Sequence, residues 1–210
     1  KWIVQNKVEN QYRVLIKSRK NDQLYSNVKN SIRKYIKEID NIDDEQRLLG
    51  IEGSASRIYF SALFDECNWS GRRPRVKHDI NNSLLDIGYT LLFSVIEALL
   101  MCYGFDLYVG IYHKIFYKRK SLVCDLVEPF RCIVDYQIKK MNTLNMIDPD
   151  DFQTINHQYV LSYQSSNDYI YVILKSILEH REEMFMFVQS YYRVFIQDKS
   201  IENFPKFIYS

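Results

Sequence analysis

The first third of the chain carries apolar and polar residues with the spacing of amphipathic helices. Residues 1–18 and residues 28–39 each place apolar side chains mostly three or four positions apart, which predicts a helix in each segment. Asp43 and Asp44 precede a third apolar segment, and aspartate is a favoured residue at a helix N-terminus. The pattern therefore predicts a third helix over residues 45–64.

Two glycines, Gly50 and Gly53, lie inside this third segment. Each costs about 1 kcal/mol relative to alanine in a helix interior. We therefore expect another part of the molecule to approach the helix backbone closely at these positions.

The helical pattern stops between residues 65 and 81, where Gly71 and Pro74 accompany a group of basic residues. Glycine and proline mark turns and loops, so this segment is predicted to be an exposed loop. Asp79 is then a suitable N-cap for a long helix that continues to Tyr103.

The longest apolar stretch of the chain runs from Ile87 to Phe105. Ser94 and Glu97 interrupt it near the centre, where a charge is costly in lipid. We therefore predict a buried helix rather than a membrane span, and no membrane partner is expected.

Residues 106–112 are predicted to form a short helix or a turn that leads to His113, and residues 114–120 a charged loop. Helical periodicity resumes over residues 121–142. Pro129 is expected in the first turn, because a proline deeper in a helix removes a backbone donor and clashes with the preceding turn.

The last part of the chain is less regular. Residues 155–171 alternate more and could hold a short strand or an irregular segment, whereas residues 170–198 are predicted to form one helix followed by a tail. Nearly every segment is helical with short connections. The predicted fold class is therefore all-α, an irregular multi-helix bundle that forms a single domain over residues 1–210.

Charge and cysteine content change this picture only locally. The formal net charge is +2, which lacks the overall basicity of a typical nucleic-acid-binding domain. Residues 1–37 carry ten Lys or Arg against two acids, and on charge alone a solvated helix face is the preferred interpretation. The four cysteines show no C-x-x-C pair, and Cys102 and Cys124 lie in apolar surroundings. Reduced, buried thiols in a cytosolic protein are expected.

Four residues suggest a chemical site. Glu52 lies in an apolar helix, where a carboxylate needs a cation as partner or must face solvent. Asp125 and Glu128 are three residues apart and would share one helix face, and His113 precedes them. Carboxylate and imidazole ligands would suit Mg²⁺ or Mn²⁺. The alternative is a surface or hydrogen-bonded histidine and two exposed acids that favour a helix N-terminus.

Two basic loops flank these acids in the sequence. The first basic loop contains Arg72, Arg73, Arg75 and Lys77, and the second basic loop contains Lys114, Lys118, Arg119 and Lys120. Metal-binding acids repel DNA, so these cations are predicted to hold its phosphates, with an affinity that falls steeply with salt. Tyr112 and Tyr117 could stack on unpaired bases, although a chain with 17 tyrosines places some near lysine by chance.

Several motifs occur in the order and spacing of a known family. They are the glycine-flanked acid in LLGIEGSASRIYF, the segment DINNSLL that begins at Asp79, the isolated His113, and SLVCDLVEPFR, which ends at Arg131. Together they resemble the Cas-one family of CRISPR-associated integrases, which insert new spacers into a CRISPR array. The resemblance covers most of residues 1–140, with KVENQ near the start, whereas residues 141–210, the C-terminal helices and tail, match only loosely.

The resemblance implies a helical catalytic domain in which Glu52, His113 and Glu128 hold Mg²⁺ or Mn²⁺, with Asp125 beside them as a further catalytic acid. In such an integrase, the 3′-hydroxyl of captured double-stranded DNA attacks a phosphodiester of the CRISPR repeat, a transesterification that needs no ATP.

Two further residues of the motifs, Asn81 and Arg131, are expected to order this site or to contact phosphate. The alternative is that Asn81 caps or bridges helices and that Arg131 pairs with Asp135 within its helix.

The resemblance also implies partners and a location. We expect a homo-oligomer in the prokaryotic cytoplasm, possibly assembled with the small adaptation protein Cas-two. The β-rich N-terminal domain that mediates dimerisation in the family has no counterpart before Trp2, so either it belongs to a longer polypeptide or assembly uses other surfaces. Two functions compete with integration: a metal-dependent nuclease that cuts branched or single-stranded DNA without joining it, and a non-enzymatic DNA-binding scaffold.

Overall fold

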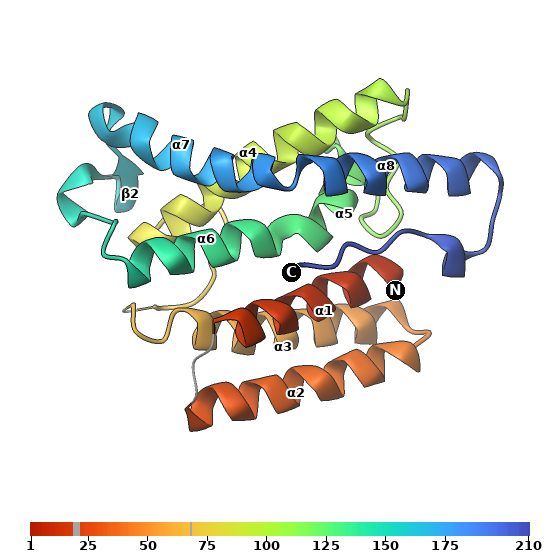
Figure 1. The fold of residues 1–210 in the computed structure, drawn as a ribbon, viewed down its shortest axis with the longest axis horizontal. Helices are drawn as coiled ribbons and strands as arrows, with labels where there is room; N and C mark the ends of the chain where they lie inside the picture. The colour runs from red at the N-terminus through yellow and green to blue at the C-terminus, as the bar shows by residue number, and fades with distance from the viewer. Residues whose placement is uncertain (19–21, 68) are drawn as a thin grey trace.

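The computed structural model describes residues 1–18, 22–67 and 69–210, and its helices form two layers (Figure 1). The lower layer consists of α1 (Trp2–Lys17), α2 (Gln23–Asp40) and α3 (Glu45–Leu63). The upper layer consists of α4 (Ile80–Cys102), α5 (Ser121–Val127), α6 (Arg131–Thr143), α7 (Tyr163–Glu179) and α8 (Arg181–Ile196). The predicted all-α class is confirmed, with one two-stranded sheet among the described residues.

Helices α1, α2 and α3 pack against one another in the lower layer, and each begins and ends close to its predicted bounds except α2, which begins earlier. Asp22 caps α2 by accepting a hydrogen bond from the backbone N–H of Tyr25. Asp44 caps α3 in the same way, as predicted. Most basic residues of the segment 1–37 are exposed, as a solvated face requires. Two of them, Arg19 and Lys20, lie outside the described residues.

Helix α4 packs against α5, α6, α7 and α8. Asp79 caps it, as predicted, by accepting a hydrogen bond from the backbone N–H of Asn82 at 2.7 Å. Gly88 allows a close approach to α6, because a Cβ atom there would lie 2.4 Å from Cγ1 of Val134. Among the described residues, α4 alone is long and apolar enough to cross a membrane, and 39% of its apolar window is buried inside the molecule. Nine of its residues are buried, among them Leu84, Leu92 and Ile96.

The helix predicted over residues 121–142 is broken at Pro129. A single 3₁₀ turn, η1 (Glu128–Phe130), separates α5 from α6. Proline cannot donate the backbone hydrogen bond that a continuous helix needs, and its ring crowds the preceding turn. The prediction of one continuous helix over residues 121–142 is therefore wrong, whereas Pro129 does lie in the first turn of a helical element, η1. The break places Glu128 between two helices.

The last third of the chain departs from its prediction in one further place. The alternating segment does hold strands, since β1 (Phe152–Ile155) and β2 (Gln158–Leu161) form an antiparallel hairpin. The single helix predicted over residues 170–198 is instead two helices, α7 and α8, which are separated at His180. Short 3₁₀ turns, η2 (Pro149–Asp151) and η3 (Ile201–Asn203), precede the hairpin and follow α8.

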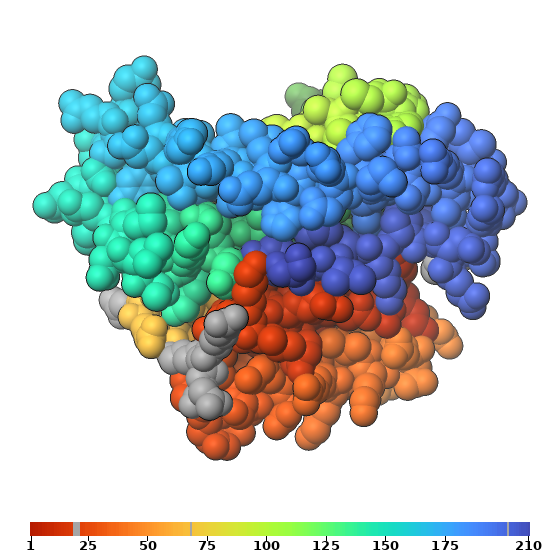
Figure 2. Space-filling model, in the orientation of Figure 1, coloured from red at the N-terminus to blue at the C-terminus, as the bar shows by residue number. Residues whose placement is uncertain are grey.

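The C-terminal segment, residues 204–210, fills the space between the two layers (Figure 2). Asn6 of α1 bonds both the backbone N–H and the carbonyl oxygen of Phe207. Asn10, one turn further along α1, accepts a hydrogen bond from the backbone N–H of Tyr209. The rings of Phe207 and Tyr209 are buried, and that of Phe207 packs on η1. The tail therefore supports the corner at η1.

Two smaller predictions are wrong. A Cβ atom at Gly50 or Gly53 would meet nothing within 4 Å in the described part of the chain, so no segment approaches α3 closely there. Cys102 is exposed because it lies at the solvent-facing end of α4, and Cys124 is half-buried, whereas both were expected in the core. Cys132 is the buried thiol.

Candidate active site

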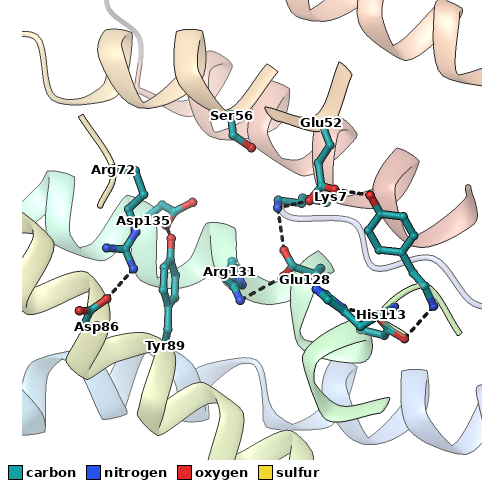
Figure 3. Close-up of polar contacts among 12 residues, drawn as sticks. Lys7, Glu52, Ser56, Arg72, Asp86, Tyr89, His113, Glu128, Arg131 and Asp135 are labelled. Carbon is teal, nitrogen blue, oxygen red and sulfur yellow. Dashed lines mark hydrogen bonds and ion pairs between the residues drawn. The ribbon is translucent and has the colours of Figure 1, made fainter. Parts of the chain in front are cut away.

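Three helical elements bring a lysine and two carboxylates together where the layers meet. Lys7 extends from α1, Glu52 from α3 and Glu128 from η1 (Figure 3). The Nζ of Lys7 lies 2.6 Å from Oε1 of Glu52 and 2.8 Å from Oε2 of Glu128. The side chains of Lys7 and Glu52 are each 14% exposed and that of Glu128 is 7% exposed. Both predicted acids thus face one position, and the ammonium group occupies it.

The buried face of α1 contains several polar residues, which explains how Lys7 reaches this position. Asn10 and Gln11 are buried on α1, three and four residues after Lys7 and therefore on the same side of the helix. Asn10 donates to the carbonyl oxygen of Pro129 at 3.1 Å, which ties α1 to η1. Gln11 donates to Oγ of Ser56 at 3.3 Å, which ties α1 to α3.

The attraction between these charges outweighs their burial. Burial alone would raise the pKa of Glu128, but Arg131 and Lys7 hold it below its usual value. Burial would likewise lower the pKa of Lys7, but Glu128 and Glu52 raise it. The ammonium group and the Glu128 carboxylate therefore stay charged at neutral pH.

His113 follows a series of turns over residues 106–112, the turn alternative of the prediction. Its Nδ1 lies 2.5 Å from Oδ1 of Asp125, whose side chain is fully buried. The same carboxylate accepts the backbone N–H groups of Ile111, Tyr112 and His113 at 2.6 to 3.0 Å. Asp125 therefore orients His113 and leaves its other ring nitrogen, Nε2, as the atom that can bind a ligand.

Gly110 permits this close arrangement. A Cβ atom there would lie 2.5 Å from the carbonyl oxygen of His113 and 2.9 Å from Oδ2 of Asp125. Any larger residue would push the carboxylate away from the turns that it holds.

Tyr112 engages the second oxygen of Glu52. Its hydroxyl donates to Oε2 of Glu52 at 2.9 Å. Partial burial and the neighbouring carboxylate raise the pKa of Tyr112 far above its usual value, so the hydroxyl stays protonated and remains a donor. The ring of Tyr112 is half-buried and its hydroxyl is bonded to Glu52, so Tyr112 does not suit the predicted stacking on bases.

Arg131 pairs with Glu128 and not with Asp135. Its Nη2 lies 3.0 Å from Oε1 of Glu128, and its guanidinium group lies over the ring of Tyr89, 4.6 Å from the ring centre. Arg72 lies over the same ring at 5.3 Å, so that Tyr89 stands between two arginines (Figure 3). Both guanidinium groups are therefore stabilised by cation–π contacts with the ring of Tyr89.

Asp135 is buried beside this group. Its carboxylate accepts hydrogen bonds from the hydroxyl groups of Tyr59, at 3.0 Å, and Tyr89. Burial raises the pKa of Asp135 to about 6, although these hydrogen bonds and the two nearby arginines oppose the shift. This acid therefore titrates just below neutral pH.

The predicted ligands suit a divalent cation chemically but are not assembled around one. Oε2 of Glu128 is buried and makes no well-aligned hydrogen bond in the described structure, in spite of its 2.8 Å contact with Lys7. Within the described ranges, no three His, Cys, Asp or Glu side chains lie close enough to hold one ion. The ammonium group of Lys7 stands between Glu52 and Glu128, and His113 is turned to Asp125, which accounts for the separation.

The first basic loop is held by α4. Arg72 donates to Oδ1 of Asn82 at 2.8 Å and to Oδ1 of Asp86 at 2.6 Å, and only 14% of its side chain is exposed. The backbone N–H of Arg75 donates to Oδ2 of Asp86 at 2.9 Å. The side chain of Arg72 thus holds the loop against α4. The basic side chains of this loop that remain wholly or partly exposed are those of Arg73, Arg75 and Lys77.

The second basic loop is tied only near its ends. Lys114 lies 3.6 Å from Glu45 of α3, and Lys120 pairs with Glu97 of α4. The exposed side chains between these ends are Ile115, Phe116, Tyr117 and Lys118, and Arg119 is half-buried.

Three adjoining hollows connect the two basic loops across the site. The first is lined by residues that include Glu52, Ser56, Tyr112, His113 and Lys114. The second, of about 180 Å³, is lined by residues that include Lys7, Ser56, Arg72, Tyr89, Glu128 and Arg131. The third shares Arg72, Tyr89 and Arg131 with the second and extends to Arg75 and Lys77. The carboxylates therefore lie midway along a groove with cations at both ends.

Asn81 lies away from this groove. Its Oδ1 accepts a hydrogen bond from Nδ2 of Asn142 at 2.7 Å, which bridges α4 and α6. It lines a separate hollow together with Lys139. The structure therefore places Asn81 as a bridge between helices.

The sequence matches the family model for CRISPR associated protein Cas1 over residues 1–173. The chain belongs to the Cas1 family. It is 32% identical over 168 residues to a CRISPR-associated endonuclease Cas1 of Archaeoglobus fulgidus, covering 72% of this chain and 48% of that protein. It is 38% identical over 107 residues to a CRISPR-associated endonuclease Cas1 of Thermus thermophilus, covering 49% of this chain and 32% of that protein. The family inferred from the motifs is confirmed, and the matched region spans less than half of either relative.

Several solved structures have the same fold. A chain of a partial Cas6-RT-Cas1–Cas2 complex aligns with a TM-score of 0.89 at 23% identity, covering 99% of this chain and 67% of that one. A Cas1 protein from Thermotoga maritima aligns with a TM-score of 0.81 at 21% identity, covering 92% and 63%. A casposase bound to an integration product aligns with a TM-score of 0.76 at 18% identity, covering 98% and 64%.

Three residues near the site of this Cas1 family member had no predicted role there: Lys7, Tyr89 and Asp135. Lys7 belongs to the KVENQ motif, and its place on the polar buried face of α1 is a signal by which it could be found. Tyr89 and Asp135 lie on different helices, so no local spacing relates them.

Proposed function

We propose that this chain is the catalytic helical part of a DNA endonuclease and integrase of CRISPR adaptation. It would join the 3′-hydroxyl ends of double-stranded spacer DNA to a CRISPR repeat by transesterification. The observation that carries the proposal is the convergence of Glu52 and Glu128, from α3 and η1, on one cation position beside His113 (Figure 3). The names of the endonuclease relatives and of the casposase complex agree with DNA cleavage and joining.

Glu52, Glu128 and Nε2 of His113 would hold Mg²⁺ or Mn²⁺. When bound, such an ion would polarise the phosphate and stabilise charge on the attacking and leaving oxygens. Asp125 would keep His113 in the orientation that presents Nε2, and Tyr112 would hold Glu52 through its second oxygen. A nitrogen ligand favours Mn²⁺ over Mg²⁺ in solution.

Double-stranded DNA would follow the groove between the two basic loops. Phosphates would contact the exposed cations at both ends, and these contacts would place the backbone over the carboxylates at the centre. Arg131, which already pairs with Glu128, is close enough to this centre to face a phosphate. Because phosphate contacts release counterions, binding would weaken steeply as the salt concentration rises.

The partners are proposed from the structural neighbours. Two of these are complexes that contain Cas2, and we infer that this chain acts in a homo-oligomer with a Cas2 partner in the prokaryotic cytoplasm. The chain spans less than half of the Archaeoglobus and Thermus relatives. The integration assay therefore includes reactions with and without Cas2.

The test is an integration assay with a short duplex that has free 3′-hydroxyls and a supercoiled plasmid that carries the repeat, in Mn²⁺ or in EDTA. The protein should join duplex to plasmid only with the metal. Glu52→Gln and His113→Ala should each lower joining by about a hundredfold or more, the scale of losing one group that stabilises transition-state charge. Glu38→Gln, which removes a partly exposed acid of α2 that pairs with Arg47 of α3, is the matched control and should retain activity.

Other products would point to the competing functions. Metal-dependent cutting without joining, with Cas2 present, would favour the nuclease. DNA binding without any metal-dependent product, unchanged by Glu52→Gln, would favour the scaffold and overturn the proposal.

A further inference from the structure

The ammonium group of Lys7 occupies the position that the two predicted metal-binding carboxylates face. Its Nζ lies within 2.8 Å of one oxygen from Glu52 and one from Glu128. The remaining oxygen of Glu52 accepts the Tyr112 hydroxyl, and the remaining oxygen of Glu128 pairs with Arg131. The cluster is therefore closed and balanced in charge, with two positive groups against two negative ones.

A divalent ion and this ammonium group cannot occupy the cluster together. The ion would need oxygen contacts of about 2.1 Å in the space where the nitrogen already lies. The two cations would also repel each other in a site that is largely shielded from water, where charge interactions are stronger than in bulk solvent. Binding of the ion therefore requires Lys7 to leave.

The structure offers Lys7 another position. The hollow of about 180 Å³ beside the site is lined by Lys7 itself and by the oxygen-bearing side chains of Gln11, Ser56 and Asp135. Arg72 and Arg131 also line it, but each already has a carboxylate partner, Asp86 and Glu128. Oε1 of Gln11 is buried and has no hydrogen-bond partner in the described part of the chain. Gln11 lies one helical turn after Lys7 on the same face of α1. An ammonium group turned into this hollow would satisfy that oxygen and approach the carboxylate of Asp135.

We propose that Lys7 is an internal counterion of the metal site. It holds Glu52 and Glu128 together in the metal-free protein and turns toward Gln11 when a divalent ion binds. Lys7 is thus a positioning residue that sets the affinity for the ion, and this inference rests on the proposed function of the carboxylates as metal ligands.

The first test compares Mn²⁺ binding by wild type and Lys7→Met, from the electron paramagnetic resonance signal of free Mn²⁺. Loss of the competing cation should tighten Mn²⁺ binding by about ten- to a hundredfold, a usual range for coupling between two sites. The metal-free variant should melt at a lower temperature than wild type, because its two buried acids lose their counterion, and Mn²⁺ should restore more of its stability. Lys139→Met is the matched control, since Lys139 is a similarly buried lysine, 10% exposed, that pairs with Glu66 away from the site. Its Mn²⁺ affinity should equal that of wild type.

The second test uses the wild-type protein, so it does not depend on the stability of a variant. In ¹⁵N spectra of lysine ammonium groups, one resonance that is missing in Lys7→Arg should shift as Mg²⁺ is added, with the same dissociation constant as metal binding. Gln11→Leu should weaken Mg²⁺ binding, because the displaced ammonium group loses its acceptor.

The outcomes separate the two proposals. Equal or weaker Mn²⁺ binding by Lys7→Met, or a Lys7 resonance that does not move at saturating Mg²⁺, would overturn the counterion role while the metal site stands. If neither wild type nor Lys7→Met binds Mn²⁺, or if Glu52→Gln and Glu128→Gln leave binding unchanged, the metal site itself fails and the counterion role fails with it.

Discussion

The two basic loops on either side of the site carry similar charge but are held differently. In the first basic loop, Arg72 is bound by Asp86 and stacked on an aromatic ring, so a guanidinium group and the loop backbone are anchored to α4. In the second basic loop, ion pairs hold Lys114 and Lys120 near the ends, while Tyr117 between them is 80% exposed.

If DNA follows the groove as proposed, this difference gives the two loops different tasks in binding it. An anchored loop presents a fixed edge and loses little conformational entropy when DNA binds. A loop with open aromatic and basic side chains can adapt to the DNA but loses side-chain entropy as it does so. Charge counted along the sequence is the same in both cases, and only the partners of each cation reveal the distinction.

The largest effect is expected from a substitution that releases the first basic loop from α4. Asp86→Ala leaves the guanidinium group of Arg72 shielded and without its carboxylate, and frees the backbone of Arg75. We expect a loss of about 3 kcal/mol in the free energy of unfolding, the scale for removing one partner of a buried ion pair. Urea unfolding measures it, with Asp168→Ala, an exposed acid on α7, as the control. A loss as small as that of the control would show that Arg72 does not anchor the loop.

The next effect concerns Asp135, which accepts a hydrogen bond from the hydroxyl of Tyr89, the ring that supports Arg72. Its folded pKa of about 6 lies above the ordinary value of 3.8, so the folded protein binds more protons than the unfolded chain between these values. The contribution of Asp135 to the free energy of unfolding therefore falls as pH rises from about 4 to 6. Asp135→Asn cannot titrate, and its unfolding free energy should fall less over this window by roughly 2 kcal/mol. Parallel pH profiles of the two proteins, from urea unfolding at each pH, would contradict the shifted pKa.

Some features of the fold could be predicted from the sequence and others could not. The helices around Asp44 and Asp79 were predictable because capping and apolar spacing are local properties. The break at Pro129 was not, since a proline can open a helix or interrupt it, and packing decides between the two. The separation of α7 from α8 at His180 carries no glycine or proline to mark it.

The site divides in the same way. Glu52, His113 and Glu128 were predicted as metal ligands through the family motifs, and the structure brings the two glutamates to one position. Lys7 and Asp135 act through contacts between segments far apart in the sequence, which local spacing cannot express.

A smaller effect is expected when the exposed aromatic side chain of the second basic loop is removed. The ring of Tyr117 is free to stack on a base, with Nζ of Lys118 5.1 Å from the ring centre. Tyr117→Ala should leave the unfolding free energy unchanged and weaken binding of single-stranded or frayed DNA by about 1 kcal/mol, the lower range for one stacked base. Fluorescence anisotropy measures the binding. Tyr163→Ala, 94% exposed at the start of α7, is the control, and equal losses in both variants would exclude a specific stack.

The smallest effect compares one exposed cation from each loop. Arg75→Ala and Lys118→Ala should each reduce the slope of log affinity against log salt by about 1, because each removes one phosphate contact. Their losses of affinity at fixed salt should nevertheless differ. The backbone of Arg75 is fixed by Asp86 at 2.9 Å, so its contact forms with less loss of entropy than that of Lys118 and contributes more net affinity. Asp86→Ala should remove this difference by making the first basic loop as free as the second. If Arg75→Ala still costs more affinity than Lys118→Ala in that background, the advantage lies in the position of Arg75 along the groove and not in how its loop is held.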